Sequence, residues 1–410
     1  MPTSKPERLC RCAGPNPALA ITTRPERKSG SVRDPRYDAL AELVLDHSLR
    51  LQAGQVLRIE GEAAAAPLVV PLHREAIKRG AHAYAVLDLA GLKELLVAYG
   101  SDEQLDFVSP MELREIEAID ASITIWSESN TRSFSRAESA RRQRQLTAQR
   151  QFGIRRRDRI ASGEHRWCGT LSPTEGHAQD ADMSLEEYED FVFRACHVLD
   201  DDPVAHWRQV GERLQARADE LSSVRELRIV GEDTELTAVV DGRTWRAAHG
   251  RQNVPDGEVY TSPVETGING TIRFGFPAVY GGREINDARL VLENGRVIAA
   301  EAAGGQEYLR SLLELDEGAS GVGEIAFGLN YEIDRFTRNI LFDEKIGGTM
   351  HLALGMGFEV LGGLNRSALH LDLICDLRRE GEVYADGELI WRSGQFLEDP
   401  QPARPAERVG

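Results

Sequence analysis

The chain has 410 residues, 41% hydrophobic and 28% charged, so it can bury a large core and is expected to be a soluble globular protein of two or three domains. No apolar run approaches the roughly 20 residues that a membrane helix needs, which argues against a membrane protein. A formal net charge of −17 argues against a nucleic-acid partner, since phosphate binding needs a positive surface.

The cysteines, at positions 10, 12, 168, 196 and 375, are odd in number and show no disulfide pattern, so we expect a reduced, cytoplasmic protein. Residues 1–34 are rich in Pro, Arg and Ser and lack the apolar region of a secretory signal. We interpret 1–34 as a disordered N-terminal extension and 401–410 as a flexible tail.

From Asp34 onward, apolar residues recur at helical spacing, and strands then alternate with helices. This alternation implies βαβ units and a parallel sheet, so residues 35–223 are predicted to form an open α/β domain. The clearest elements are strands at 55–62, 81–90, 121–130 and 165–171 and a helix at 64–80.

Ten arginines lie within residues 132–159. They could form a phosphate-binding patch, but a solvated helix face with arginines paired to acids is the favoured interpretation.

Two helices follow, at 184–199 and at about 203–222. The first begins with Ser184 and has Glu187 three residues later, which is the pattern of a capping box.

From about residue 225 the pattern changes to short strands separated by D-G, N-G and G-G turns. We therefore expect a second domain over 224–400, with a linker near 222–225. The predicted fold class is α/β, with an open parallel-sheet domain followed by a β-rich α+β domain that binds metal.

The metal prediction starts from two apolar segments that each contain a histidine. In NRSALHLDLICDL, His370 and Asp372 are two residues apart, which places both side chains on one face of a strand. An imidazole and a carboxylate on one rigid strand are ready ligands for a divalent cation. His351, in LFDEKIGGTMHLALG, is a further candidate ligand.

Glu258 and Glu324 also lie in apolar or turn-rich surroundings, where an unpaired carboxylate is costly unless a cation or hydrogen bonds compensate it. Each residue alone has a structural explanation, such as a hydrogen-bonded core histidine. Together these nitrogen and oxygen ligands suit one or two divalent ions such as Mn, Zn or Co. The chain lacks H-E-x-x-H, G-x-S-x-G, C-x-x-C and Walker motifs.

Several segments resemble the aminopeptidase T / AmpS family of metallopeptidases. The resemblance covers about 36–400, and it implies an α/β domain, a metal domain, a homo-oligomer and a two-metal site. Its implied ligands are Glu258, Glu324, His351, His370 and Asp372, and the two glutamates are also expected to act in catalysis. The matching segments are 166–191, GEVYTSPVETGINGTI, GEIAFGLN, LFDEKIGG…HLALG and NRSALHLDLICDL.

One position departs from the family pattern. Family aminopeptidases have a catalytic tyrosine seven residues after the first histidine, and here that position is Phe358. Tyr331 or Tyr384 could substitute for the missing hydroxyl. A relative of the family, 5-nitroanthranilate aminohydrolase, needs no such hydroxyl, so the main prediction is hydrolytic removal of an amino group from a small aromatic amine.

In that interpretation Arg283, Arg289 and Phe358 contact the substrate, with an arginine holding its carboxylate. The alternative is a metal-dependent aminopeptidase acting on peptides. An iron-dependent ring-opening dioxygenase, using His351, His370 and Asp372, is a third possibility. A structural metal in a binding subunit is disfavoured because structural zinc sites are usually rich in thiolates.

Overall fold

The computed structural model describes residues 34–397. The predicted extension, apart from Asp34, and the predicted tail over 401–410 lie outside the described residues. Among the helices of the described part, none is long and apolar enough to cross a bilayer. Cys168, Cys196 and Cys375 are free and buried.

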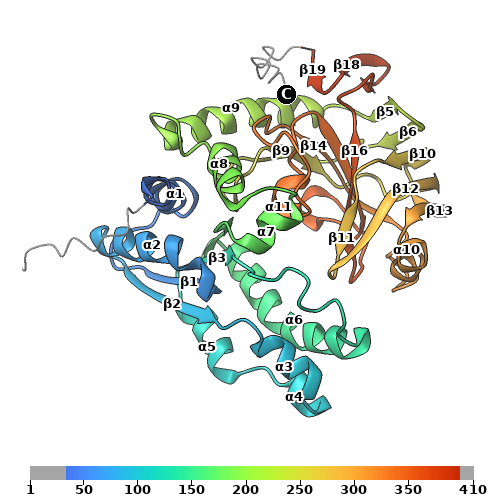
Figure 1. Ribbon diagram of the computed structural model, residues 1–410. Coiled ribbons are helices and arrows are strands. Elements are labelled where there is room, and N and C mark those ends of the chain that lie inside the picture. The colour runs from blue at the N-terminus through green and yellow to red at the C-terminus, as the bar shows by residue number, and fades with distance from the viewer. Residues whose placement is uncertain (1–33, 398–410) are drawn as a thin grey trace, which may run out of the picture. The chain divides into compact units, whose positions relative to one another are not determined.

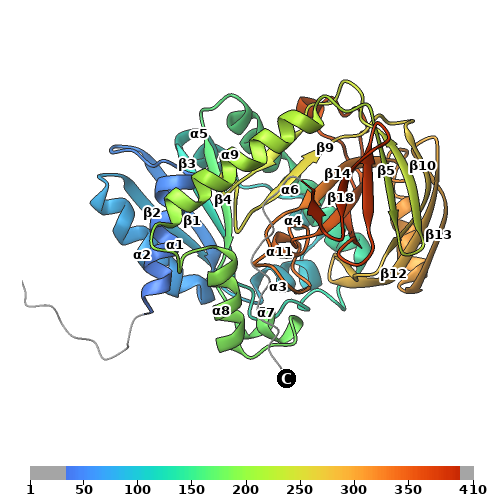
Figure 2. The ribbon, with the colours of Figure 1, turned by 90° about the horizontal axis from the view of Figure 1, so that it is seen from above.

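The first half of the described chain builds a parallel sheet in the order β2-β1-β3-β4-β8 (Figure 1 and Figure 2). All four strands predicted for this half are present, which confirms the α/β class. The short β8 comes from later in the chain and pairs with Gly169 and Thr170 of β4. The division into 35–223 and 224–400 stays a prediction. The strands are β1 (Val56–Glu62), β2 (His82–Asp88), β3 (Ala121–Trp126), β4 (Arg166–Leu171) and β8 (Asn253–Val254).

Helices flank this sheet, and most begin at a residue that can cap them. The capping box predicted at Ser184 and Glu187 is confirmed, because each side chain bonds the other's backbone N–H. The helices of this half are α1 (Pro35–Leu43), α2 (Ala66–Lys78), α3 (Leu92–Tyr99), α4 (Asp102–Asp106), α5 (Pro110–Ala118), α6 (Ser139–Ala161), α7 (Glu175–Asp180), α8 (Leu185–Ala195) and α9 (Pro203–Leu221), with a π-turn η1 (Val44–Ser48) after α1 and a 3₁₀ turn η2 (Ala63–Ala65) before α2.

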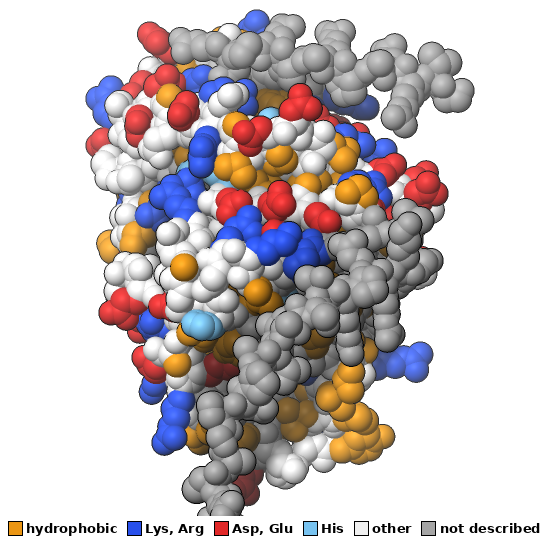
Figure 3. Space-filling view, turned by 90° about the vertical axis from the view of Figure 1, so that its left-hand side faces the viewer, with side chains coloured by type: hydrophobic (Ala, Val, Ile, Leu, Met, Phe, Trp, Pro, Cys, Tyr) orange, Lys and Arg blue, Asp and Glu red, His pale blue; other side chains and the backbone are white. Residues whose placement is uncertain are grey.

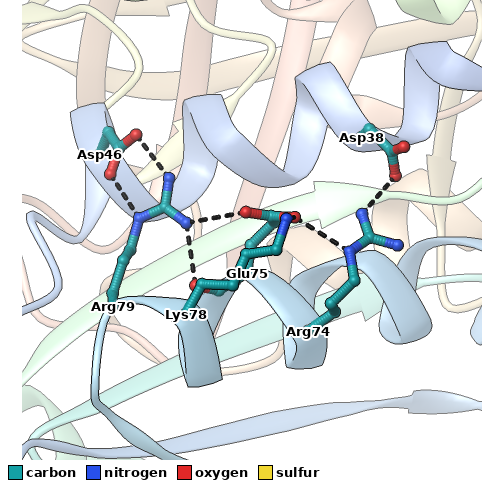
Figure 4. A network of polar contacts seen from close by, with 6 residues as sticks. All are labelled: Asp38, Asp46, Arg74, Glu75, Lys78 and Arg79. Atoms are coloured by element: carbon teal, nitrogen blue, oxygen red, sulfur yellow. Dashed lines mark hydrogen bonds and ion pairs between the residues drawn. The ribbon is translucent and has the colours of Figure 1, made fainter. Parts of the chain in front are cut away.

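A network of ion pairs ties α1 and η1 to α2 (Figure 4). Glu75 on α2 is buried and accepts hydrogen bonds from three basic side chains of its own helix region. Arg79 donates to both carboxylate oxygens of Asp46 at 2.7 Å, and Arg74 donates to Asp38 at 2.8 Å. The buried carboxylate is thus compensated, as burial of a charge requires.

Most of the arginine-rich segment lies in helix α6, and several of its arginines pair with acids as predicted. Arg144 bonds Asp102 and Asp106, and Arg155 pairs with Glu117. Acidic and basic side chains are likewise interspersed on the face of the molecule shown in Figure 3. The interpretation of this segment as a solvated, ion-paired helix face is confirmed.

The second half contains two antiparallel sheets. The large antiparallel sheet has the order β11-β12-β10-β6-β5-β17-β18-β19, with β13 beside β12, and the small antiparallel sheet has the order β16-β15-β14-β9-β7. Their strands are β5 (Glu226–Gly231), β6 (Thr234–Val239), β7 (Arg246–Ala248), β9 (Glu258–Thr261), β10 (Ile268–Phe274), β11 (Ala278–Tyr280), β12 (Arg283–Glu293), β13 (Arg296–Gly304), β14 (Val322–Gly328), β15 (Thr349–Gly355), β16 (His370–Asp376), β17 (Glu382–Ala385), β18 (Glu388–Arg392) and β19 (Gln395–Phe396), and the helical pieces are α10 (Gln306–Leu313), α11 (Ile340–Asp343) and η3 (Glu359–Leu361).

The small sheet has two unlike faces. Alternate residues such as Phe327 on β14, Leu352 on β15 and Leu373 on β16 belong to the apolar core shared with Leu227 and Ile272 of the large sheet. Because side chains alternate across a strand, the residues between them point to the other face. That face carries the candidate site.

Candidate metal centre

The five predicted ligands meet on the polar face of the small sheet. Its adjacent strands lie about 4.8 Å apart, so side chains far apart in sequence come together there. His370 and Asp372 share this face, as their spacing predicted. These candidate ligands are Glu258 on β9, Glu324 on β14, His351 on β15, and His370 and Asp372 on β16.

The distances within the cluster are short. Glu324 lies at its centre, with one oxygen 3.8 Å from His351 Nε2 and the other 3.3 Å from His370 Nε2. His370 Nε2 is also 3.4 Å from Asp372 Oδ1, and His351 Nε2 is 3.8 Å from Glu258 Oε2. The ligand atoms of Glu324, His351 and Asp372 all lie within 4.8 Å of one another, which is a spacing that could hold one ion.

Backbone carbonyls orient both histidines. His351 Nδ1 lies 3.1 Å from the carbonyl oxygen of Glu344, and His370 Nδ1 lies 3.4 Å from that of Met356. A carbonyl can only accept, so each Nδ1 carries the proton and donates it. Each Nε2 therefore faces the carboxylates, which is the arrangement that metal-binding histidines use.

The cluster concentrates negative charge in a buried place. Glu258 Oε2 and Asp372 Oδ1 are buried and have no hydrogen-bond donor among the described residues. Burial raises the pKa of the Glu258 carboxyl well above its usual value. Burial opposes protonation of His351, but the hydrogen bond and charge of Glu324 raise its pKa to about 9. The site thus favours added positive charge, and its oxygen and nitrogen donors fit a divalent cation.

Sequence reasoning missed a lysine beside this cluster. Lys345 is fully buried and pairs with Glu344. Burial alone would lower the pKa of its ammonium, but the charges of Glu344, Glu258 and Asp256 outweigh burial and raise it. The sequence feature that could have indicated this lysine is the segment DEKIGG, in which two acids precede the lysine and apolar residues follow it. The positive charge of Lys345 therefore compensates the negative charges of Glu344, Glu258 and Asp256 at this side of the cluster.

Replacing Lys345 by methionine should destabilise the metal-free protein by about 3–5 kcal/mol, because the acids near it lose a buried counter-charge. Lys78→Met is the matched control, since Lys78 also pairs with a glutamate but is 62% exposed, and it should cost under about 1 kcal/mol. Urea unfolding of both variants measures the difference. Equal midpoints for the two variants would show that Lys345 does not compensate the acids.

A hollow of about 470 Å³ borders the cluster. Phe358 lies at its wall, with its ring 5.5 Å from that of Tyr260 and 5.7 Å from that of His370. Tyr331 and Tyr384 line no part of this hollow, and their hydroxyls donate to the Gly394 carbonyl and to Glu382. The residues lining the hollow include Gln215, Arg246, Arg251, Asp256, Glu258, Tyr260, Glu324, Glu344 and Phe358.

The two arginines predicted to hold a substrate are not brought to the cluster. Arg289 on β12 pairs with Asp233 and borders a separate hollow with Thr271. Arg283 lies at the start of β12, over the ring of Tyr308 at 4.0 Å. Neither lines the hollow beside the cluster, because their position between ligand segments in the sequence does not fix their place in the sheet.

A second histidine group lies outside this site. His197 Nδ1 and His206 Nδ1 lie 3.3 Å and 2.8 Å from the same oxygen of Asp200. Their rings stack with centroids 3.7 Å apart and planes 19° from parallel. Nearly parallel rings do not aim both nitrogen lone pairs at one ion, so this group is two imidazoles sharing a carboxylate.

Comparisons with known proteins agree with this architecture. A family model described as thermophilic metalloprotease (M29) matches residues 33–396. Aminopeptidase 2 of Geobacillus stearothermophilus is 28% identical over 403 residues, covering 88% of this chain and 97% of that protein. Aminopeptidase AmpS of Bacillus subtilis (strain 168) is 29% identical, covering 56% of this chain and 63% of that protein. The solved structure of wild-type AmpT from Thermus thermophilus has the same fold, with a TM-score of 0.79 at 23% identity, covering 88% of this chain and 99% of that one.

Proposed function

The chain belongs to the thermophilic metalloprotease (M29) family, and we propose that it is a metal-dependent aminopeptidase that releases N-terminal residues from peptides. The observation that carries this proposal is the group of two imidazoles and three carboxylates on one sheet face, beside a hollow. Support comes from a relative named Aminopeptidase 2, which matches over nearly its whole length. A cytoplasmic homo-oligomer is part of the same proposal.

The main prediction from sequence, an aromatic-amine aminohydrolase, is wrong. It depended on the missing hydroxyl at Phe358. The family model spans almost the whole described chain, and the matching relatives are named aminopeptidases. Hydrolysis of a C–N bond with a metal is retained, and a peptide replaces the small aromatic amine as the proposed substrate.

The residues present fit a divalent cation, as the donor-less buried oxygens of Glu258 and Asp372 indicate. We assign its ligation to those two residues together with Glu324, His351 and His370, for one or two ions of Mn, Zn or Co. A divalent cation bound there makes water a stronger nucleophile at neutral pH and polarises a carbonyl oxygen.

The chain's own groups supply binding and proton transfer. The carboxylates of Glu258 and Glu324 border the hollow and attract the ammonium group of a peptide N-terminus. The same carboxylates are placed to accept a proton from the attacking water and to return it to the leaving amine. Phe358 excludes water from one wall of the hollow.

Tyr260 is our candidate for the missing hydroxyl. It lines the hollow, its ring packs edge-on against Phe358, and it follows Glu258 by two residues on the same face of β9. Burial raises the pKa of its phenol, so the hydroxyl stays protonated and can donate a hydrogen bond to a developing oxyanion.

The proposal is tested with aminoacyl-anilides and their N-acetylated counterparts. We expect hydrolysis of the free-amine substrates only, complete loss of activity after chelation, and recovery on adding Mn, Zn or Co ions. The metal content of the active protein is measured by mass spectrometry in parallel. Hydrolysis that survives chelation, or that is as fast for the N-acetylated substrates, would overturn the proposal.

A further inference from the structure

Arg251 lines the hollow without an acidic partner among the described residues, and two further arginines act on its charge. Arg251 lies in the loop between β7 and β8, and the two further arginines are Arg50 and Arg208. Among the described residues, no carboxylate forms an ion pair with any of the three, whereas the α6 arginines discussed above are paired. Burial and these two neighbouring cations lower the pKa of Arg251 to about 10. The concentrated positive charge around Arg251 favours the binding of an anion.

Arg246 adds a fourth positive charge, and its position is fixed by the register of the small sheet. On the edge strand β7, Arg246 pairs with Tyr260 of β9, and Ala248 pairs with Glu258. Side chains of directly paired residues share a face, so Arg246 lies on the face that carries the metal ligands. Both Arg246 and Arg251 line the same hollow as Glu258 and Glu324.

The strands that carry Glu324 and Arg246 are separated by the length of a short peptide. In the sheet order β14-β9-β7, two strand spacings, about 10 Å, separate β14 from β7. An extended peptide spans at most about 3.3–3.6 Å per residue, so two or three residues cover about 7–11 Å. Carboxylates at one end attract an ammonium group, and arginines at the other attract a carboxylate.

We propose that Arg246 and Arg251 bind the C-terminal carboxylate of a di- or tripeptide whose amino end lies at Glu258 and Glu324. This inference rests on the proposed aminopeptidase activity and specifies its substrate class. The arginines are specificity residues that touch the end of the substrate, and Arg50 and Arg208 strengthen the positive field around Arg251.

The test compares di- and tripeptides with their C-terminal amides, using metal-loaded protein. The wild-type kcat/KM should be about 10- to 100-fold higher for the free acids, which is the value of a charge-assisted hydrogen bond, and most of the difference should lie in KM. Equal values for acid and amide in the wild type would overturn the inference without any variant.

Variants add a second readout. In Arg251→Met and Arg246→Met the ratio of kcat/KM for acid over amide should fall toward one. Arg157→Met, which removes an exposed arginine of α6 that forms no ion pair with a described acid, should keep the wild-type ratio. An unchanged ratio in both variants would also overturn the inference. If the chain hydrolyses neither form nor any aminoacyl-anilide, the proposed function fails instead.

Discussion

Replacing His370 by alanine should lower kcat for aminoacyl-anilide hydrolysis by more than about 100-fold. Loss of a residue that merely orients a ligand typically costs 10- to 100-fold, so loss of a ligand should cost more. His370 is partly exposed at the rim of the cluster, 3.3 Å from Glu324 and 3.4 Å from Asp372, so its removal leaves the apolar core intact.

The same variant has a readout that does not depend on activity. A cation that binds the folded chain stabilises it, and at a given cation concentration the melting temperature rises more when the cation binds more tightly. Adding Mn, Zn or Co ions should therefore raise the melting temperature of the wild type more than that of His370→Ala. His82→Ala, which removes an exposed histidine on β2, is the control and should behave as the wild type. Full activity and an undiminished metal effect in His370→Ala would remove this residue from the site.

Replacing Tyr260 by phenylalanine should lower kcat by about 10²–10³-fold with little change in KM. That is the usual cost of removing one donor to an oxyanion, because the hydrogen bond strengthens only in the transition state. Tyr384→Phe is the control, since its hydroxyl bonds Glu382 away from the hollow. It should retain wild-type kinetics.

A double variant sharpens this prediction. The rings of Tyr260 and Phe358 are 5.5 Å apart on the wall of one hollow. In Tyr260→Phe combined with Phe358→Tyr, the hydroxyl moves to the position where relatives of the resembled family have their tyrosine. We expect the double variant to regain part of the lost kcat. Wild-type kcat in Tyr260→Phe alone would show that another group, or none, stabilises the oxyanion.

Features set by local periodicity were predicted correctly. The strands of the parallel sheet, the capping box of α8 and the pairing of the α6 arginines all follow from short-range patterns. His370 and Asp372 likewise lie on one face, since a strand repeats every two residues whatever surrounds it. The positions of the other candidate ligands, Glu258, Glu324 and His351, relative to one another depend on the order of the strands. In the sequence, each could still be recognised as an ionisable residue in an apolar or turn-rich segment.

Errors arose where proximity in sequence was taken for proximity in space. Arg289 lies between two ligand segments, yet it belongs to the large antiparallel sheet, where Asp233 pairs with it. Phe358 lines the hollow, but the main prediction gave too much weight to its missing hydroxyl. Tyr260 lines the same hollow, and the sequence alone does not reveal that its ring packs edge-on against that of Phe358.

The sequence by itself therefore determined the α/β class and the metalloprotease family, and it supplied a set of candidate ligands, because these depend on composition, local periodicity and motif spacing. Only the tertiary structure decided which charges lie near the candidate ligands: buried Lys345 is close enough to Glu258 for their charges to interact, and Arg246 and Arg251 line the hollow. Their placement follows from the order β14-β9-β7 and from the loop that leads to β8. Such long-range pairing is fixed by packing of the whole core, which no local pattern encodes.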